Sequence, residues 1–118
     1  EFPQSEEGEE YFRQRIQKSL ALIVEKNNER IGYLVAATHR PESYRNTDKI
    51  AEIENMYVEP DHRSKGLGTK LIDEFKEWAE NQDAGRIRVE ASAQNKQAVK
   101  FYRKNGFEDY AITLEEEI

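Results

Sequence analysis

Two glycines and two cations lie close together in the run Arg63-Ser64-Lys65-Gly66-Leu67-Gly68. A regular apolar pattern starts at Leu67, so the glycines stand where a helix is predicted to begin. The first turn of a helix leaves backbone N–H groups without partners and has a partial positive charge, and glycine lets a phosphate approach the backbone closely. The run therefore predicts an anion site, and it suits a pyrophosphate better than a single carboxylate.

Two common nucleotide-binding motifs do not fit these glycines. The dinucleotide fingerprint G-x-G-x-x-G lacks its third glycine, because Leu71 stands in that place. The P-loop sequence G-x-x-x-x-G-K-[ST] does not occur in the chain. NAD-dependent redox chemistry and ATP hydrolysis are therefore disfavoured.

A second patterned run lies nearer the C-terminus, Asn95-x-x-Ala98-x-x-Phe101-Tyr102-x-x-x-Gly106-Phe107. It is similar to the late helix of the GNAT superfamily of N-acyltransferases. The earlier run agrees, because Arg63-x-x-Gly66-x-Gly68 after Met56-Tyr57-Val58-x-Pro60 resembles the acyl-CoA pyrophosphate motif of that superfamily. The two runs stand in the family's order and spacing, and the resemblance covers roughly Ile50 to Leu114.

The resemblance implies where acetyl-CoA, the expected co-substrate, would bind; no metal is expected. The backbone of Met56, Tyr57 and Val58 would hold the pantetheine arm and polarise the thioester carbonyl, where two neighbouring strands splay apart. Asn95 would bond the pantetheine arm, and Tyr102 would lie near the thioester sulfur. The pyrophosphate would be held beside Arg63 by the backbone of the residues that follow it: Ser64, Lys65, Gly66, Leu67, Gly68 and Thr69.

Attack of an amine on a thioester needs a base, donors for the carbonyl oxygen and an acid for the leaving thiolate. Tyr102 is the candidate acid, because a phenol with a reference pKa of about 10 is protonated at neutral pH. The candidate base is Glu52, which matches the position used by part of the family; Glu54 and Glu90 are alternatives, and some members use no dedicated base. Each side chain also has a structural reading: Tyr102 as a core aromatic, Asn95 as a helix N-cap, and the glutamates as solvated strand residues.

The elements before this region are predicted from apolar periodicity. Phe12, Ile16 and Leu20 recur every four residues, which predicts an amphipathic helix from Glu9 to about Ser19. The acidic stretch from Glu1 to Gly8 has no periodic pattern and is read as a frayed lead-in.

A hairpin, a loop and a strand are predicted next. Ala21 to Val24 and Ile31 to Thr38 flank a turn at Asn27-Asn28 and predict an antiparallel hairpin. The segment His39 to Lys49 reads as a loop, so His39 is expected at the surface, as is His62. Ala51 to Val58 alternates as a strand that ends at Pro60. One face would hold Ala51, Ile53, Asn55 and Tyr57, and the other Glu52, Glu54, Met56 and Val58.

The remaining pattern alternates helices with strands. It predicts a helix from about Gly66 to Asn81, a strand from Arg86 to Ala91, a helix capped by Asn95 and stopped at Asn105-Gly106, and a last strand from Phe107 to Leu114. The run Glu115 to Glu117 reads as a solvated tail.

This order predicts an α/β (α+β) domain spanning 1–118, with a mixed, mostly antiparallel sheet flanked by helices and a parallel pair at the CoA site. Family members usually begin with a strand and a first helix. Only one helix is predicted before the hairpin here, so the first strand lies upstream in a longer protein or this is a minimal form. A single strand after Gly106 leaves a sheet edge that a second copy could complete, which makes a homodimer a candidate assembly.

Composition narrows the function classes. The chain has 24 acidic residues against 18 Lys and Arg, a net charge of −6, which disfavours nucleic acid and tolerates a cationic acceptor. It has no cysteine, hence no thiol nucleophile, and no apolar run of the roughly 20 residues that span a bilayer. A cytoplasmic protein without membrane partners is expected.

The predicted function is acetyl transfer from acetyl-CoA to a primary amine of a small molecule or a protein. The alternative is a regulatory module that binds CoA without turnover. A third hypothesis is a structural α/β domain whose glycine loop binds another anion.

Overall fold

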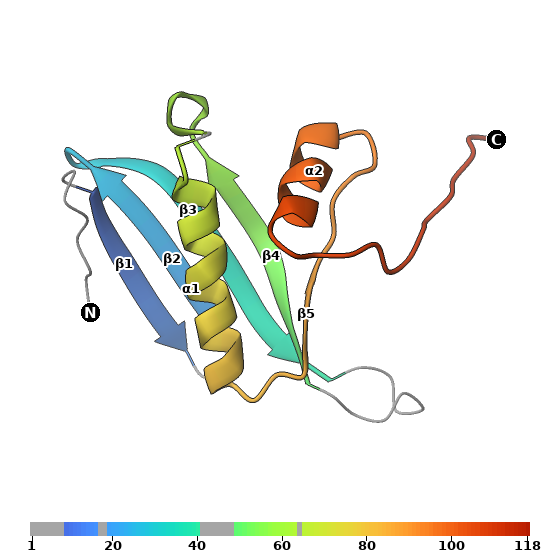
Figure 1. Ribbon diagram of the computed structural model, residues 1–118, viewed down its shortest axis with the longest axis horizontal. Helices are drawn as coiled ribbons and strands as arrows, with labels where there is room; N and C mark the ends of the chain where they lie inside the picture. The colour runs from blue at the N-terminus through green and yellow to red at the C-terminus, as the bar shows by residue number, and fades with distance from the viewer. Residues whose placement is uncertain (1–8, 17–18, 41–48, 64) are drawn as a thin grey trace.

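Five strands form one sheet in the computed structural model of the chain (Figure 1), which describes residues 9–16, 19–40, 49–63 and 65–118. In both chain order and sheet order the strands are β1 (Glu9–Ile16), β2 (Ser19–Lys26), β3 (Glu29–His39), β4 (Ile50–Val58) and β5 (Arg86–Val89). Strands β1 to β4 are antiparallel to their neighbours, whereas β5 is parallel to β4. This mixed sheet confirms the predicted fold class.

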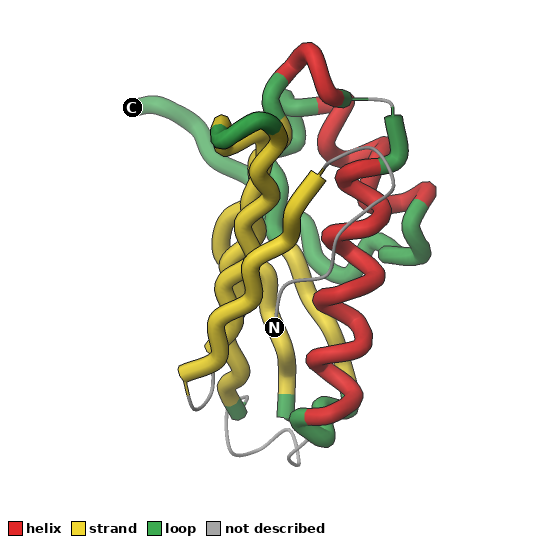
Figure 2. The backbone as a smooth tube through the Cα atoms, turned by 90° about the vertical axis from the view of Figure 1, so that its left-hand side faces the viewer, coloured by secondary structure: helices red, strands yellow, loops and turns green. Residues whose placement is uncertain are grey.

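The helices connect and follow the later strands. A short 3-10 turn, η2 (Pro60–His62), and the helix α1 (Leu67–Asn81) lie between β4 and β5, and α2 (Lys96–Lys104) follows β5. Both helices lie on the same side of the strands (Figure 2); α1 contributes buried side chains to the core cluster, and partly buried side chains of α2 pack against it. The opposite side of the sheet is called the open face below. None of the helices in the described part of the chain is long and apolar enough to cross a membrane.

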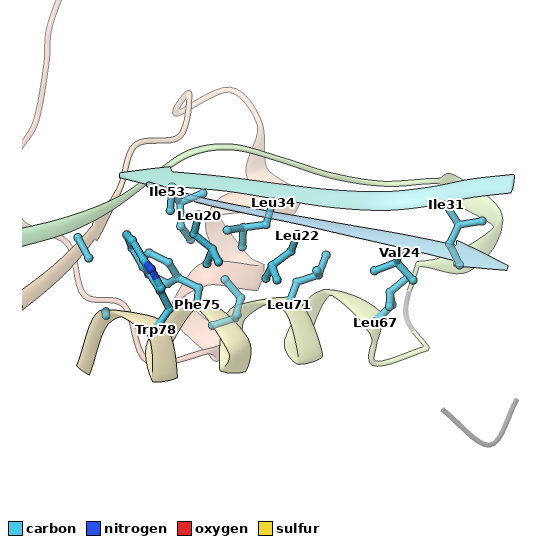
Figure 3. Close-up of a cluster of buried hydrophobic side chains, with 14 residues drawn as sticks. Leu20, Leu22, Val24, Ile31, Leu34, Ile53, Leu67, Leu71, Phe75 and Trp78 are labelled. Carbon is cyan, nitrogen blue, oxygen red and sulfur yellow. The ribbon is translucent and has the colours of Figure 1, made fainter. Parts of the chain in front are cut away.

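The hydrophobic core lies between α1 and the sheet (Figure 3). The predicted apolar stripe of α1 is confirmed, because its members are all buried: Leu67, Leu71, Ile72, Phe75, Trp78 and Ala79. They face apolar side chains of β2, β3 and β4, among them Leu22, Leu34 and Ile53. This packing fixes α1 against β4, and so fixes where the glycine loop lies relative to that strand.

Truncation of Phe75 tests this core. The ring is fully buried beside Trp78, with the two ring centroids 6.3 Å apart. Phe75→Ala should lower the free energy of unfolding by about 3–5 kcal/mol, because it leaves a cavity that the sheet cannot close. Urea unfolding followed by the fluorescence of Trp78, the single tryptophan, measures the change. The exposed variant Asp73→Ala is the control and should stay within about 0.5 kcal/mol of the unaltered protein; equal losses in both would contradict this description of the core.

The helix predicted from Glu9 to Ser19 is wrong, because β1 occupies residues 9–16 and pairs along its whole length with β2. A spacing of four residues fits both periods, since positions i and i+4 share a face in a helix and in a strand. Leu20, the third residue of the presumed stripe, belongs to β2 and is buried in the core. Residues 9–16 form a strand because they pair with β2, and no local sequence pattern encodes that pairing. The lead-in 1–8 lies outside the described residues.

A β-bulge interrupts the alternation predicted along β4. Successive residues of β3 pair with Ile53 and then with Asn55, so Glu54 is an extra residue in β4. Ile53 is buried, Met56 packs against the same core, and Tyr57 is exposed. The prediction that Asn55 and Tyr57 share a face with Ile53 is therefore wrong, because one inserted residue moves every later side chain to the other face.

The hairpin is confirmed, and Asn27 and Asn28 turn it with positive φ angles of 54° and 67°. Strand β5 ends at Val89, two residues earlier than predicted. Of the predicted loop from His39 to Lys49, residues 41–48 lie outside the described residues, and β3 extends through His39.

The last predicted strand, from Phe107 to Leu114, does not form, because the residues after α2 contain no strand. Arg103, in the last turn of α2, binds both carboxylate oxygens of Asp109 at 2.8 and 2.9 Å. Tyr110 then lies against the guanidinium groups of both β5 arginines, 5.2 and 5.6 Å from the ring centroid. These contacts place Tyr110 beside β5 without adding a strand to the sheet, in which β5 is the last strand.

Candidate functional site

Strands β4 and β5 are paired over only part of their length. The parallel pairing joins Ile50–Ile53 to Arg86–Val89, and β5 then ends while β4 continues to Val58. From residue 54 to residue 58, the described chain places no strand on the β5 side of β4. Backbone groups on that side can therefore bond an extended ligand, as the edge of a sheet bonds an added strand. This gap is called the splay below, and it corresponds to the predicted backbone site at Met56, Tyr57 and Val58.

The glycine loop lies directly beyond the splay. Gly66 is the N-cap of α1 with φ 86°, a conformation that favours glycine, and no side chain caps the helix. The first backbone bond of the helix runs from the Lys70 N–H to the Gly66 carbonyl at 3.0 Å. The N–H groups of Leu67, Gly68 and Thr69 thus precede the regular helix bonds and remain available to an anion. Lys65 and Thr69 are exposed. The predicted helix start is confirmed, and Ser64 lies outside the described residues.

The Arg63 side chain connects the glycine loop to the end of β4. Its Nε donates to the carbonyl oxygen of Val58 at 2.7 Å, and its guanidinium lies 5.4 Å from the ring centroid of Tyr57. Tyr57 in turn faces Tyr33 of β3, with the ring centroids 6.0 Å apart. Arg63 therefore ties the loop to the end of β4, a structural contact in addition to its positive charge.

Helix α2 packs against the start of α1 at Gly68. A Cβ atom at Gly68 would lie 2.9 Å from Cζ of Phe101, closer than side chains ordinarily approach. The second glycine of the loop thus allows α2 to approach α1. At the start of α2, Asn95 Oδ1 accepts a hydrogen bond from the Ala98 N–H at 3.1 Å, which confirms the predicted N-cap. The cap uses only Oδ1 and leaves the amide Nδ2 to donate elsewhere.

Tyr102 is half-buried on the helical side of the splay. Its hydroxyl lies 3.9 Å from Sδ of Met56, in the unpaired part of β4, and its ring meets Phe101 and Phe107 edge-on at 5.4 and 5.8 Å. Burial raises the pKa of the Tyr102 phenol, because removal from water disfavours the phenolate. A thioether is a weak hydrogen-bond acceptor, so the hydroxyl can donate to a better acceptor in the splay. Tyr102 therefore has features of both predicted roles: its ring packs against the core, as a core aromatic would, and its hydroxyl reaches β4, as the candidate acid would.

The three candidate glutamates occupy different places. Glu52 lies between buried neighbours on β4, so its side chain is on the open face, where its Oε1 is 2.8 Å from Nε2 of His39. Glu54 is the exposed bulge residue, and Glu90 is exposed just beyond β5. Tyr102 and Glu52 therefore approach β4 from opposite faces of the sheet. The contact with His39 was missed by the sequence reading, and only the strand register could have revealed it.

Comparisons with known proteins agree with this geometry. Residues 1–107 match the model of the acetyltransferase (GNAT) family. An uncharacterised N-acetyltransferase of Methanocaldococcus jannaschii is 34% identical over 64 residues, which are 54% of this chain and 28% of that protein. The thialysine N-epsilon-acetyltransferase of Mus musculus is 35% identical over 63 residues, 53% of this chain and 37% of that protein.

A solved structure shows the same fold. The aminoglycoside N-acetyltransferase AAC(6')-Iy in complex with CoA superposes with a TM-score of 0.76 at 19% identity, covering 88% of this chain and 69% of that one. The matched stretches span less than a third of the first curated relatives' own length, 28%, 30% and 24%.

Proposed function

Because this chain belongs to the acetyltransferase (GNAT) family, we propose that it transfers the acetyl group of acetyl-CoA to a primary amine of a small molecule or a protein. The proposal rests chiefly on the splay of β4 and β5, which has Tyr102 on its helical side and is preceded by Glu52, on the open face at the paired end of β4. The amine adds to one face of the planar thioester carbonyl, whereas the sulfur leaves from the carbonyl plane, so the base and the acid must stand at separate positions. A base on one face and an acid on the other match that requirement.

Acetyl-CoA fits the site through backbone groups of α1 and β4 and through the amide of Asn95. The pyrophosphate would bond to the first-turn N–H groups of α1, next to Lys65, and the pantetheine arm would extend along the unpaired part of β4. Asn95 Nδ2 would bond the arm at the start of α2. That a solved neighbour of the same fold is described as a complex with CoA supports this assignment.

In the proposed mechanism, one side chain on each face of the sheet transfers a proton: Glu52 on the open face and Tyr102 on the helical side. Glu52 takes a proton from the incoming ammonium, and backbone N–H groups of the splay stabilise negative charge on the carbonyl oxygen. The new bond joins the amine nitrogen to the acetyl carbon, the bond between that carbon and sulfur breaks, and the nitrogen releases its second proton to water. Tyr102 donates its phenolic proton to the departing thiolate, and water restores it.

The acceptor class is proposed as a polyamine, an aminoglycoside or a lysine-like amine. The net charge of −6 favours approach of a cationic acceptor. A relative acts on thialysine and a structural neighbour on aminoglycosides, according to their names. The reaction proposed here needs no metal; among the described residues, no group of three metal-binding side chains comes together.

The test is calorimetric binding of acetyl-CoA, followed by thiol release with spermidine, kanamycin, lysine and a lysine-containing peptide. Micromolar binding together with thiol release for at least one amine supports the proposal. Binding without thiol release for any amine would support the regulatory module instead. No binding of acetyl-CoA would refute both and leave the glycine loop as a structural element.

The variant Glu52→Gln tests the base. We expect kcat/KM for the amine to fall about 20-fold at pH 7, less than the usual hundredfold or more for a general base, because water can reach this carboxylate. The loss should shrink at alkaline pH, where the free amine is already neutral. Glu54→Gln and Glu90→Gln are matched controls that should change kcat/KM less than about twofold. A larger loss in either control would move the role of base to that residue.

A further inference from the structure

The open face holds a histidine–carboxylate pair, His39 and Glu52, and the proposed mechanism uses only its carboxylate. His39 Nε2 lies 2.8 Å from Glu52 Oε1, with exposed side-chain fractions of 43% and 24%. Among the described residues, His39 provides the polar contact of the Glu52 carboxylate. The contact engages one carboxylate oxygen and leaves Oε2 for another partner.

Strand register explains why these two side chains meet. Ala37 of β3 is directly opposite Glu52 of β4, and His39 lies two residues farther along β3 on the same face. Diagonal neighbours of this kind are within reach of long side chains. Because Ala37 is small, the imidazole can extend toward Glu52 without crowding. The pair is therefore set by the register of the sheet.

Few other charged groups face the carboxylate from the elements packed around it. Arg88 of β5 is the in-register neighbour of Glu52, but its guanidinium lies over the ring of Tyr110, 5.6 Å from the centroid. On β4 itself the nearest acid is Glu54, which is exposed at the bulge. From β3, His39 is the titratable group that makes contact. The imidazole is thus the described group in contact with Glu52, and it carries a charge only when it is protonated.

We propose that His39 is a positioning residue that holds Glu52 for the acceptor amine and makes its basicity depend on the charge of the imidazole. This inference rests on the proposed function, in which Glu52 takes the proton of the amine. A neutral His39 fixes Oε1 and leaves Oε2 aimed at the acceptor. A protonated His39 forms an ion pair with Glu52, which stabilises the ionised carboxylate and makes it a poorer base. Acetyl transfer therefore declines as the solution is acidified and His39 gains its proton.

Two substitutions separate the charge of His39 from its hydrogen bond. In His39→Gln, the amide Nε2 lies near the place of the imidazole Nε2 and can donate the same bond, but it cannot gain a charge. In His39→Asn, the shorter amide does not reach Glu52. His62→Gln is the matched control, because His62 is the second of the two histidines and lies in η2.

The first measurement is the pH profile of kcat/KM for thiol release with the best amine of the panel, spermidine, kanamycin, lysine or the peptide. The ratio of activity at pH 8 to activity at pH 6 should be about threefold smaller in His39→Gln than in the unaltered protein. Protonation of the amine affects both proteins equally and cancels from this comparison. His39→Asn should lower kcat about fivefold across the whole range, with an unchanged KM for acetyl-CoA. Profiles of the unaltered protein and His39→Gln that superimpose would overturn the proposal.

The second measurement does not depend on turnover. With two histidines in the chain, the ring Cε1 and Cδ2 protons give two signals for each histidine in an NMR spectrum, and His62→Gln identifies them. At pH 7, Glu52→Gln should shift the His39 signals and leave those of His62 in place; unmoved His39 signals would also overturn the proposal. If the His39 signals shift but no amine is acetylated, the pair exists and the proposed function is what has failed.

Discussion

Gly66→Asp should weaken acetyl-CoA binding at least about 100-fold, a loss of about 2.8 kcal/mol. The new carboxylate would stand at the N-cap of α1, beside the N–H groups of Leu67 to Thr69 proposed to hold the pyrophosphate. It would repel the phosphates and compete for the same donors. Steric crowding does not account for the expected loss of binding, because an added Cβ at Gly66 meets no atom within 4 Å. Calorimetry with acetyl-CoA measures the loss.

The control is Gly66→Asn, which has nearly the same shape without the charge. Asparagine tolerates positive φ better than most residues, so both variants should lose a similar stability of about 1 kcal/mol or less. Binding by Gly66→Asn should stay within about fivefold of the unaltered protein. If both variants lose binding equally, the backbone conformation rather than the phosphate charge is what matters, and the proposed pyrophosphate site would need revision.

Tyr102→Phe should lower kcat about 100-fold or more and leave acetyl-CoA binding within about twofold. The ring would still pack against Phe101 and Phe107, so only the hydroxyl beside Met56 is lost. Without that proton donor, the thiolate must leave unprotonated or take its proton from water. Thiol release at saturating acetyl-CoA gives kcat, and calorimetry gives the binding constant. Tyr110→Phe, in the exposed tail, is the matched control with unchanged kcat.

The direction of the Tyr102 pKa shift predicts how activity and stability respond to alkali. Because burial raises this pKa, Tyr102 loses its proton at a higher pH than a free tyrosine, and the alkaline decline of kcat should lie above the ordinary tyrosine pKa of about 10. For stability, the unfolded chain ionises Tyr102 first, so its contribution is complete below about pH 10 and is lost as the pH rises further. Tyr102→Phe should lack this alkaline loss of stability. A kcat that declines below pH 9 in step with Tyr102 ionisation would contradict the assignment.

Most of the chemistry-bearing region could be predicted because its signals are local. The glycine loop, the stripe of α1 and the Asn95 cap depend on residues within a few positions of one another. The N-terminal segment was misread because Phe12 and Ile16 recur at a spacing shared by helix and strand. The pattern after Gly106 was misread because a strand needs a partner edge, and the residues after α2 add no strand to the sheet.

The sequence by itself determined the α/β class and the start of α1 at a pair of glycines, since residue type and short-range spacing encode both, whereas the acid and the base are proposals that rest on the family resemblance. Tertiary structure decided which faces those residues occupy. The bulge at Glu54 reverses the alternation of β4 and turns Met56 toward Tyr102. The register of β3 on β4 brings His39 to Glu52. Such contacts join residues distant in the chain, and they form only when strand pairing and core packing select one register among many.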